Sequence, residues 1–286
     1  MSRAGVAVGG PDDLTIAPAE IERQITPRTR AIMVMHYGGY PCRMKAIAEI
    51  AARHGLAVIE DAAHAPGASL DGKALGTWGD AGCFSFFSNK NLATGEGGML
   101  VTNRDDVAEK VRLLRSHGMT TLTWDRHRGH AYTYDVVELG YNYRIDEIRS
   151  ALGLAQLRKL RANHARRQAI TRQYRLALGD SGIDLPFQHA IEESAYHIFP
   201  ILLPSNLDRT RFIDLMREAR IQTSIHYPPI HQFSYYAGRY PGIRLPLTEE
   251  AARREVTLPL YPAMGDEAVA AVISAVRNAL DCVHTS

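Results

Sequence analysis

The chain has 286 residues, of which 45% are apolar and 22% are charged, which is typical of a folded globular protein and excludes a largely disordered one. Its 33 lysines and arginines nearly balance its 31 aspartates and glutamates, so the net charge of +2 gives no electrostatic reason to bind nucleic acid or an anionic membrane. The three cysteines, Cys42, Cys83 and Cys282, are widely spaced, and the start has no signal-peptide core. These features predict a cytoplasmic protein with a small ligand.

The first half begins with a pattern typical of a parallel sheet. Residues 31–36 form an apolar run that suits a buried strand, and residues 43–54 carry apolar side chains at helical spacing before Gly55. A second apolar run covers residues 56–59. Strand, helix and strand with short connections predict a right-handed parallel βαβ unit, and hence an α/β domain with helices covering its sheet.

Further elements extend this domain and lead out of it. Residues 82–86 and 99–102 are predicted strands, and residues 106–115 are a predicted helix. Residues 144–178 predict one or two long helices. Several arginines in this stretch are interpreted as a charged, solvated helix face rather than a site for an acidic partner, among them Arg158, Arg166, Arg167 and Arg175.

The second half predicts a separate α+β module. It contains a strand at 196–203, where Pro200 favours an edge position, and a helix at 208–219. A strand at 221–226 and a final helix at 266–280 follow. The predicted domains are therefore residues 1–160, a large domain, and residues 161–286, a small C-terminal α+β domain.

Three residue types that suit one cofactor occur close together in the sequence. Asp61 ends an apolar strand, where ligands of parallel sheets collect, although as an isolated residue it would be read as a helix or turn cap. Lys90 lies in SFFSNKNLATGEGG, five residues after Ser85 and before a glycine-rich turn. Pyridoxal phosphate (PLP) needs a carboxylate for its ring nitrogen, a lysine for its aldehyde, and hydroxyls or amides for its phosphate. Asp61, Lys90 and Ser85 supply one of each.

Three successive motifs carry a family resemblance: EDAAHAPGA, GDAGCFSFFSNKNLATGEGG and ELGYNYRIDEIRSALGLAQL. In order and spacing they resemble the DegT/DnrJ/StrS family of PLP-dependent nucleotide-sugar aminotransferases, from about Asp12 to the C-terminus. The resemblance implies the aspartate-aminotransferase fold (fold type I), with a three-layer αβα large domain. It also implies that Lys90 is the catalytic Schiff-base lysine.

The resemblance assigns further roles. Asp61 would pair with the pyridinium nitrogen, His64 would lie beside the cofactor ring, and Ser85 would bind the phosphate. Asn142, in GYNYR, matches an asparagine that reaches the phosphate in the neighbouring subunit's site, and Arg144 would lie near the substrate. A homodimer with shared active sites follows from the resemblance.

The stretch SIHYPPIHQFSYY resembles the part of the family's small domain that approaches the sugar nucleotide, which makes His226, Tyr227 and His231 substrate-binding candidates. A metal site is not predicted there, because no carboxylate or cysteine has suitable spacing. His127 and His130 are interpreted as part of an exposed polar loop, with a mobile loop over the site as the alternative.

The implied reaction transfers an amino group from an amino acid, typically glutamate, to a nucleotide-linked keto-sugar in polysaccharide or natural-product sugar synthesis. HYGGYP at 36–41 is similar to members that act at the sugar C4 position. Two alternatives stay open: a non-catalytic homologue that serves as a binding or partner subunit, and a PLP-dependent sugar dehydratase. Dehydratases of this fold carry histidine in place of the lysine, so Lys90 argues against that chemistry.

The sequence departs from the family at its start. The family's N-terminal quarter has no counterpart here, and it carries a Gly-Thr loop for the phosphate, an aromatic residue stacked on the cofactor ring and part of the central sheet. The large domain is therefore expected to be N-terminally incomplete. A misassigned start codon, a split enzyme and a remnant without catalysis are the three explanations that fit.

Overall fold

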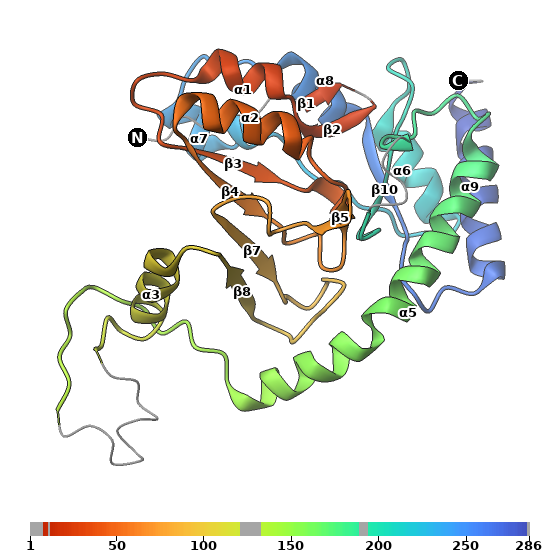
Figure 1. Cartoon of the computed structure of the whole chain (residues 1–286). Helices are drawn as coiled ribbons and strands as arrows, with labels where there is room; N and C mark the ends of the chain where they lie inside the picture. Colours follow the sequence, from red (N-terminus) through yellow and green to blue (C-terminus); the bar gives the residue numbers. More distant parts are fainter. Residues whose placement is uncertain (1–7, 11, 121–132, 189–193, 285–286) are drawn as a thin grey trace.

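The computed structural model is centred on a four-stranded sheet with the strand order β3-β4-β7-β8 (Figure 1). The first three strands are parallel, as the βαβ pattern predicts, and β8 runs antiparallel to β7. The strands are β3 (Ala31–Met35), β4 (Ala57–Asp61), β7 (Ala81–Ser85) and β8 (Gly98–Val101). The structure describes residues 8–10, 12–120, 133–188 and 194–284.

One face of this sheet is covered by two helices, α1 (Pro18–Gln24) and α2 (Met44–His54) (Figure 1). Side chains from the sheet and the helices form one core there, including Ile32, Val34, Met44, Ile47 and Val58. α2 ends where Gly55 adopts the left-handed conformation, with φ of 62°, which glycine tolerates without steric cost. On the other face Met33 remains 62% exposed, so the two faces are covered unequally.

Shorter elements complete this half. β1 pairs with β2 and β5 pairs with β6, both antiparallel, and α3 follows β8. Their bounds are β1 (Val8–Gly10), β2 (Asp13–Ile16), the 3-10 turn η1 (Tyr37–Gly39), β5 (Ser69–Leu70), β6 (Lys73–Ala74) and α3 (Asp105–Leu114).

A single helix, α5 (Glu147–Leu178), connects the two halves (Figure 1). It starts at Asp146, whose carboxylate accepts the amide N–H of Arg149 at 2.8 Å as an N-cap. The predicted boundary at residues 160/161 falls inside this helix, and the division into two domains stays a prediction.

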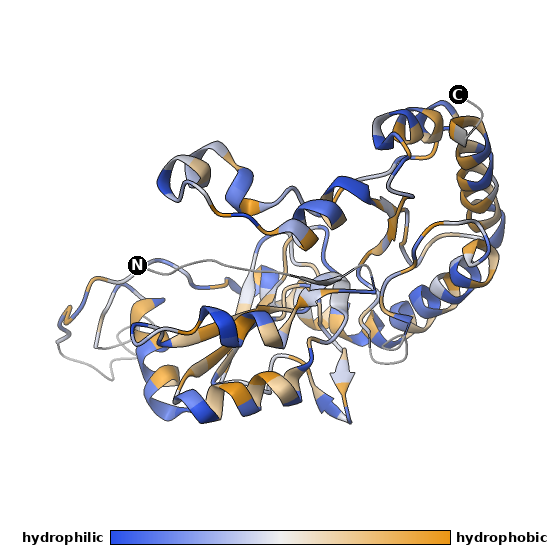
Figure 2. Cartoon of the chain, turned by 90° about the horizontal axis from the view of Figure 1, so that it is seen from above, coloured by the Kyte–Doolittle hydropathy of each residue, from blue (hydrophilic) through white to orange (hydrophobic). Residues whose placement is uncertain are grey.

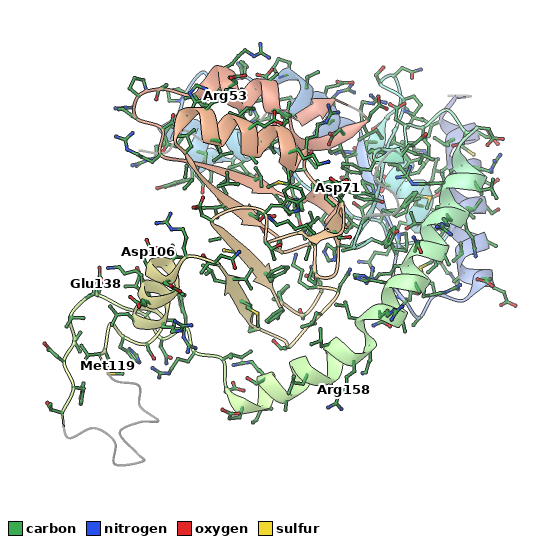
Figure 3. All side chains as sticks on the ribbon, viewed as in Figure 1. Arg53, Asp71, Asp106, Met119, Glu138 and Arg158 are labelled. Carbon is green, nitrogen blue, oxygen red and sulfur yellow. The ribbon has the colours of Figure 1, made fainter. Side chains whose placement is uncertain are left out.

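The interpretation of the α5 arginines as a solvated face is wrong for three of them. Arg158 points outward from the helix, as expected (Figure 3). Arg167 is buried and donates to the carbonyls of Tyr196, His197 and Leu260. Arg166 and Arg175 likewise donate to backbone carbonyls of the second half. A guanidinium has five N–H donors, so it can satisfy several buried carbonyls at a chain crossing.

The second half has its own core, built on the antiparallel pair of β9 (Phe199–Leu202) and β10 (Glu255–Leu258). Large buried residues from these strands and from α5, α6 and α9 fill it, including Tyr174, Phe199 and Phe212. The C-terminal helix α9 shows apolar and polar residues side by side, as an amphipathic helix does (Figure 2). The remaining bounds are α6 (Arg209–Glu218), η3 (Ile230–Gln232), α7 (Ser234–Arg239), α8 (Pro246–Arg254) and α9 (Asp266–His284).

The predicted strand at 221–226 is wrong. The segment makes one isolated bridge, between Ser224 and Thr257, and the neighbouring residues do not extend it into a strand. The His226 N–H donates to the side chain of Glu255 instead, at 2.8 Å, and Pro228 and Pro229 have no N–H to donate. Within the described residues, no helix combines the length and apolar character needed to cross a membrane.

Candidate active site

The carboxyl ends of β4 and β7 bring two of the predicted site residues onto one sheet face. Asp61 ends β4 and pairs in register with Cys83 on β7, and Ser85 lies two residues further along β7. Since side chains alternate along a strand, Asp61, Cys83 and Ser85 point to the same side. One Asp61 oxygen, Oδ1, accepts the Ala63 N–H at 3.0 Å, and the Ser85 hydroxyl accepts the Phe87 N–H at 3.3 Å.

Glu60, next to Asp61, serves the opposite face. Its buried carboxylate accepts the amides of Gly76, Trp78 and Gly79 at 2.6–2.7 Å and pairs with His36 Nε2 at 2.9 Å. Burial alone would raise the Glu60 pKa, but these hydrogen bonds lower it overall. The pair of adjacent carboxylates therefore divides into a structural residue and a residue that faces the site.

Lys90 follows β7 in a tight turn, where its N–H donates to the Phe87 carbonyl at 3.0 Å. Burial lowers the pKa of the partly buried ammonium, and the charge of Asp61 acts in the opposite direction. The two side chains are thus close enough to interact electrostatically. A lysine with a lowered pKa is deprotonated more readily, which suits it to act as a nucleophile or base.

His64 is buried, and its hydrogen bonds define its tautomer. Its Nδ1 accepts the Gly38 N–H at 3.3 Å, and its Nε2 lies 3.2 Å from the Tyr227 hydroxyl. Burial, with smaller effects from the charges of Lys90 and His226, lowers its pKa to about 3. The imidazole is therefore neutral, and the Nε2–H donates to Tyr227. The structure brings His64, Tyr227 and Lys90 together.

His197 and Asn91 belong to the same cluster, although no sequence pattern pointed to them. The rings of His197 and His64 lie 4.3 Å apart between centroids. Asn91 Nδ2 donates to the Ala195 carbonyl at 2.7 Å, so its Oδ1 accepts from His197 Nδ1 at 3.1 Å. Burial and the neighbouring charges lower the His197 pKa. The position of Asn91, directly after Lys90, was the signal that could have identified it.

His226 enters the cluster from the second half. Its ring centroid lies 4.8 Å from that of Tyr227, and burial followed by the charge of Lys90 lowers its pKa. Behind it, Glu255 accepts the His226 N–H at 2.8 Å, and the Tyr37 hydroxyl donates to the His226 carbonyl. Burial raises the Glu255 pKa to about 7. Glu255 and Thr257, which contacts both residues, were also missed in the sequence.

Three predicted residues lie apart from the cluster. Asn142 forms an isolated bridge with Ser116 and is exposed, and Arg144 donates to the Ser116 hydroxyl at 3.4 Å. This segment lies beside the end of α3, where the amides of Tyr141 and Tyr143 donate to the carbonyls of Leu114 and Arg115 (Figure 1). His231 pairs with Glu249 at 2.8 Å. His127 and His130 lie outside the described residues.

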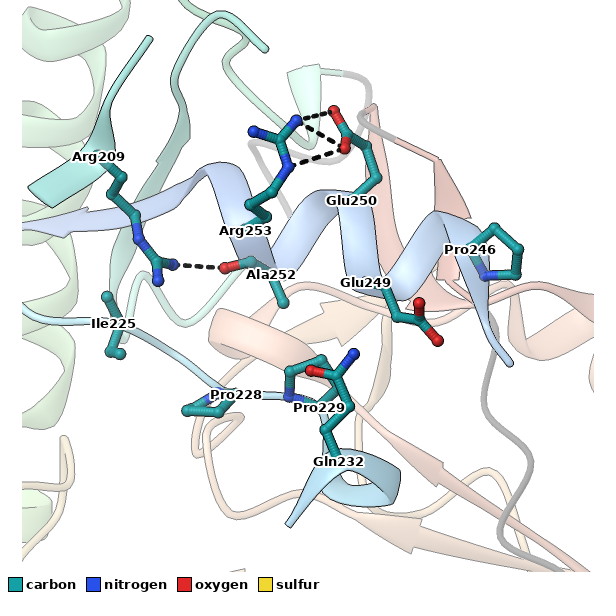
Figure 4. Close-up of a pocket in the computed structure, with 10 residues that line it drawn as sticks. All are labelled: Arg209, Ile225, Pro228, Pro229, Gln232, Pro246, Glu249, Glu250, Ala252 and Arg253. Carbon is teal, nitrogen blue, oxygen red and sulfur yellow. Dashed lines mark hydrogen bonds and ion pairs between the residues drawn. The ribbon is translucent and has the colours of Figure 1, made fainter. Parts of the chain in front are cut away.

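The His231 region borders a groove of about 610 Å3 (Figure 4). Pro228, Pro229 and Gln232 line one wall, and the turns of α8 from Pro246 to Arg253 line the other. The chain therefore leads from His226 and Tyr227, which lie in the cluster around Lys90, directly to Pro228 and Pro229 in the wall of this groove.

The chain is similar to several solved structures. It superimposes on 70% of DesV from S. venezuelae with a TM-score of 0.85 and 34% identity, covering 95% of the present chain. It matches 73% of Helicobacter pylori PseC, an aminotransferase involved in the biosynthesis of pseudoaminic acid, with a TM-score of 0.87 and 28% identity, covering 96% of the present chain. These matches confirm the predicted α/β fold of aminotransferase type.

A sequence relative points the same way. The Bacillus subtilis spore coat polysaccharide biosynthesis protein SpsC is 38% identical over 273 residues, which are 93% of this chain and 70% of SpsC. The family model for the DegT/DnrJ/EryC1/StrS aminotransferases matches residues 7–277. This coverage, together with the lysine cluster at the sheet edge, shows that the chain belongs to the DegT/DnrJ/EryC1/StrS aminotransferase family.

Proposed function

We propose that this protein uses PLP to transfer an amino group from an amino acid, such as glutamate, to the keto group of a nucleotide-linked sugar. The observation that carries the proposal is a partly buried Lys90 with a lowered pKa, whose charge interacts with that of Asp61 at the carboxyl end of β4. A solvated surface lysine would have neither the burial nor the facing carboxylate.

The donor set fits PLP. Asp61 is an acceptor for a protonated ring nitrogen, since Oδ1 takes one amide and the carboxylate keeps further lone pairs. Ser85 provides a hydroxyl for the phosphate, and Lys90 provides the amine. His64, held between Gly38 and Tyr227, provides a neutral ring surface beside them. When bound, PLP supplies an aldehyde that exchanges amines and a ring that accepts the electron pair of the reacting carbon.

Lys90 is the group that moves protons in this proposal. Its lowered pKa increases the neutral amine fraction near neutral pH, and a placed proton-transfer group contributes about 10²–10⁴ in rate. His64, with a pKa of about 3, is too weak a base to compete. The charge of Asp61 acts against the lowering of the Lys90 pKa, because it favours the protonated amine.

The sugar side is assigned to His226 and Tyr227, with Arg144 and His231 as further candidates. The names of PseC and SpsC, an aminotransferase of pseudoaminic acid biosynthesis and a polysaccharide biosynthesis protein, support a sugar substrate. The HYGGYP stretch favours amination at C4, in the cytoplasm where nucleotide sugars are made.

A homodimer explains two further observations. Apolar side chains are exposed on the segment before α5 and on its first turns: Leu139, Tyr143, Ile148, Leu154 and Leu157. An apolar surface of this kind marks an interface. Asn142, exposed within the same region, would then reach the partner's phosphate site, as the family resemblance implies.

The test is to purify the chain with PLP, remove the excess and reduce with borohydride. Peptide mass mapping should locate the adduct on Lys90, and glutamate should change the visible spectrum. Lys90→Ala should lose both signals and all turnover, whereas Lys159→Ala, at an exposed position on α5, should retain them.

Product analysis separates the alternatives. Amino transfer consumes one amino donor for each aminated sugar, whereas a dehydratase leaves the donor nitrogen in place. A chain that takes up no PLP, or that carries it on another lysine, would contradict the proposal.

A further inference from the structure

Three side chains in the second half form a directed hydrogen-bond chain that ends at His226. Thr257 Oγ1 lies 2.5 Å from Glu255 Oε1 and 2.8 Å from His226 Nδ1. The second Glu255 oxygen, Oε2, accepts the backbone N–H of His226 at 2.8 Å. Glu255 and Thr257 are both buried. The carboxylate therefore contacts the same histidine twice, once directly and once through the threonine hydroxyl.

The direction of each bond follows from what the groups can donate. An ionised Glu255 can only accept, so the Thr257 hydroxyl gives its hydrogen to Oε1. The Thr257 oxygen must then accept from His226, which places the ring hydrogen on Nδ1. Nε2 lies on the far side of the ring from Thr257 and keeps an unprotonated lone pair.

We propose that Glu255 and Thr257 are positioning residues that hold His226 in its Nδ1–H tautomer, so that Nε2 accepts a hydrogen bond from a hydroxyl group of the sugar substrate. The ligand assignment rests on the proposed function, whereas the tautomer assignment does not. A neutral acceptor nitrogen suits a hydroxyl donor and disfavours a keto oxygen, carboxylate or phosphate, which carry no hydrogen to donate.

His226 faces the lysine cluster. Burial lowers its pKa and the Lys90 charge adds to this effect, and the His226 charge in turn contributes to the lowered pKa of His64 and of His197. Its ring also lies edge-on to Tyr227, which accepts from His64. The His226 ring therefore lies within electrostatic range of the Lys90 amine.

Protonation of Glu255 reverses the chain. A protonated Oε1 donates to Thr257, Thr257 donates to His226 Nδ1, and the ring hydrogen moves to Nε2. The groups around Glu255 are Arg209 on α6, whose charge favours the ionised form, and Tyr37, Tyr227 and the His226 amide. Burial raises the Glu255 pKa to about 7, so both forms are accessible near neutral pH.

Nitrogen NMR of the whole chain labelled with 15N-histidine tests the tautomer without substrate. The His226→Asn variant identifies the His226 signals by their loss. At pH 8.5 we expect Nδ1–H and an unprotonated Nε2 in the wild type and in Thr257→Ser, which keeps the hydroxyl. Glu255→Gln should show Nε2–H at every pH. Its oxygen must accept the His226 N–H, so its NH2 group faces Thr257 and reverses the chain.

An Nε2–H tautomer in the wild type at pH 8.5, or an unchanged tautomer in Glu255→Gln, would overturn the positioning role. A merely structural role would destabilise the variant without moving the ring hydrogen. An Nδ1–H tautomer that is retained in Thr257→Ser but lost in Thr257→Val would support the role of the threonine hydroxyl. Loss of folding in Thr257→Val leaves the Glu255→Gln and Thr257→Ser spectra to decide.

The ligand half uses UDP-glucose and dTDP-glucose as probes, with binding followed by their phosphorus signals. Binding should shift the Nε2 resonance of wild-type His226. In Glu255→Gln the affinity for the sugar nucleotide should be about tenfold lower at pH 8.5, as expected for loss of one hydrogen bond. Binding without an Nε2 shift would overturn the hydroxyl contact. If neither sugar nucleotide binds, the substrate class and the hydroxyl contact both fail, while the tautomer result stands by itself.

Discussion

The buried carboxyl of Glu255 makes a specific prediction about how stability depends on pH. Burial raises its pKa from the model-peptide value of 4.5 to about 7. The folded state therefore holds the proton more tightly than the unfolded state does. Its contribution to stability is complete below pH 4.5 and is lost as the pH rises through 7. For these two pKa values the loss between pH 5 and pH 8 is about 2–3 kcal/mol.

Glu255→Gln removes this titration while keeping the side-chain shape. We expect the free energy of unfolding of the wild type, relative to the variant, to fall by about 2–3 kcal/mol from pH 5 to pH 8. Urea unfolding of both proteins at half-unit pH steps measures the difference, and titrations shared by the two proteins cancel. Glu218→Gln, at an exposed position on α6, is the matched control and should give no such trend. A constant difference across this range, or a rise toward pH 8, would refute the argument that Glu255 is buried with a raised pKa.

Two further predictions concern packing and assembly. Asn91→Ala should lower the free energy of unfolding by about 1–3 kcal/mol, because the Ala195 carbonyl and the buried His197 Nδ1–H lose their partner; urea unfolding, with exposed Asn103→Ala as the control, measures this. Ile148→Glu, at a side chain that is 83% exposed, should convert a dimer to a monomer in sedimentation without loss of the helical circular dichroism signal, and an unchanged dimer would place the interface elsewhere.

The helices and strands that could be predicted from the sequence are those that form from a local pattern of apolar residues. The strands β3 and β4 and helix α2 were predictable because short apolar runs and helical spacing alternate there without interruption. The segment 221–226, in which Ile221 and Ile225 are separated by polar residues, is not a strand. Its His226 N–H is taken by the Glu255 side chain, which lies 29 residues away in sequence. A periodic pattern cannot reveal such a long-range competitor for a backbone amide.

The candidate site likewise contains residues that the sequence pattern predicts and residues that it does not. Asp61 and Lys90 could be predicted as site residues because Asp61 ends a strand, Lys90 follows one, and each carries the chemistry that one cofactor needs. Glu255 and Thr257 could not, because they alternate with apolar residues in EVTL, a pattern in which the polar residues are normally taken to face solvent, whereas all four residues are buried. Their role depends on the position of His226, which only the folded chain provides.

The three histidines around Lys90 stay neutral, and this decides what they contribute. Burial is the largest cause that lowers the pKa of each, and the Lys90 charge adds to the effect. They therefore supply directed hydrogen bonds rather than protons, in keeping with the proposed role of Lys90 in proton transfer. His64 accepts through Nδ1, whereas His197 donates through it, as does His226 in the proposed state with Glu255 ionised. The partner of each Nδ1 thus sets whether the opposite nitrogen offers a hydrogen or a lone pair. If His226 Nε2 contacts the substrate as proposed, changing the partner of Nδ1 would change which polar groups this histidine accepts, without replacing the residue that touches the substrate.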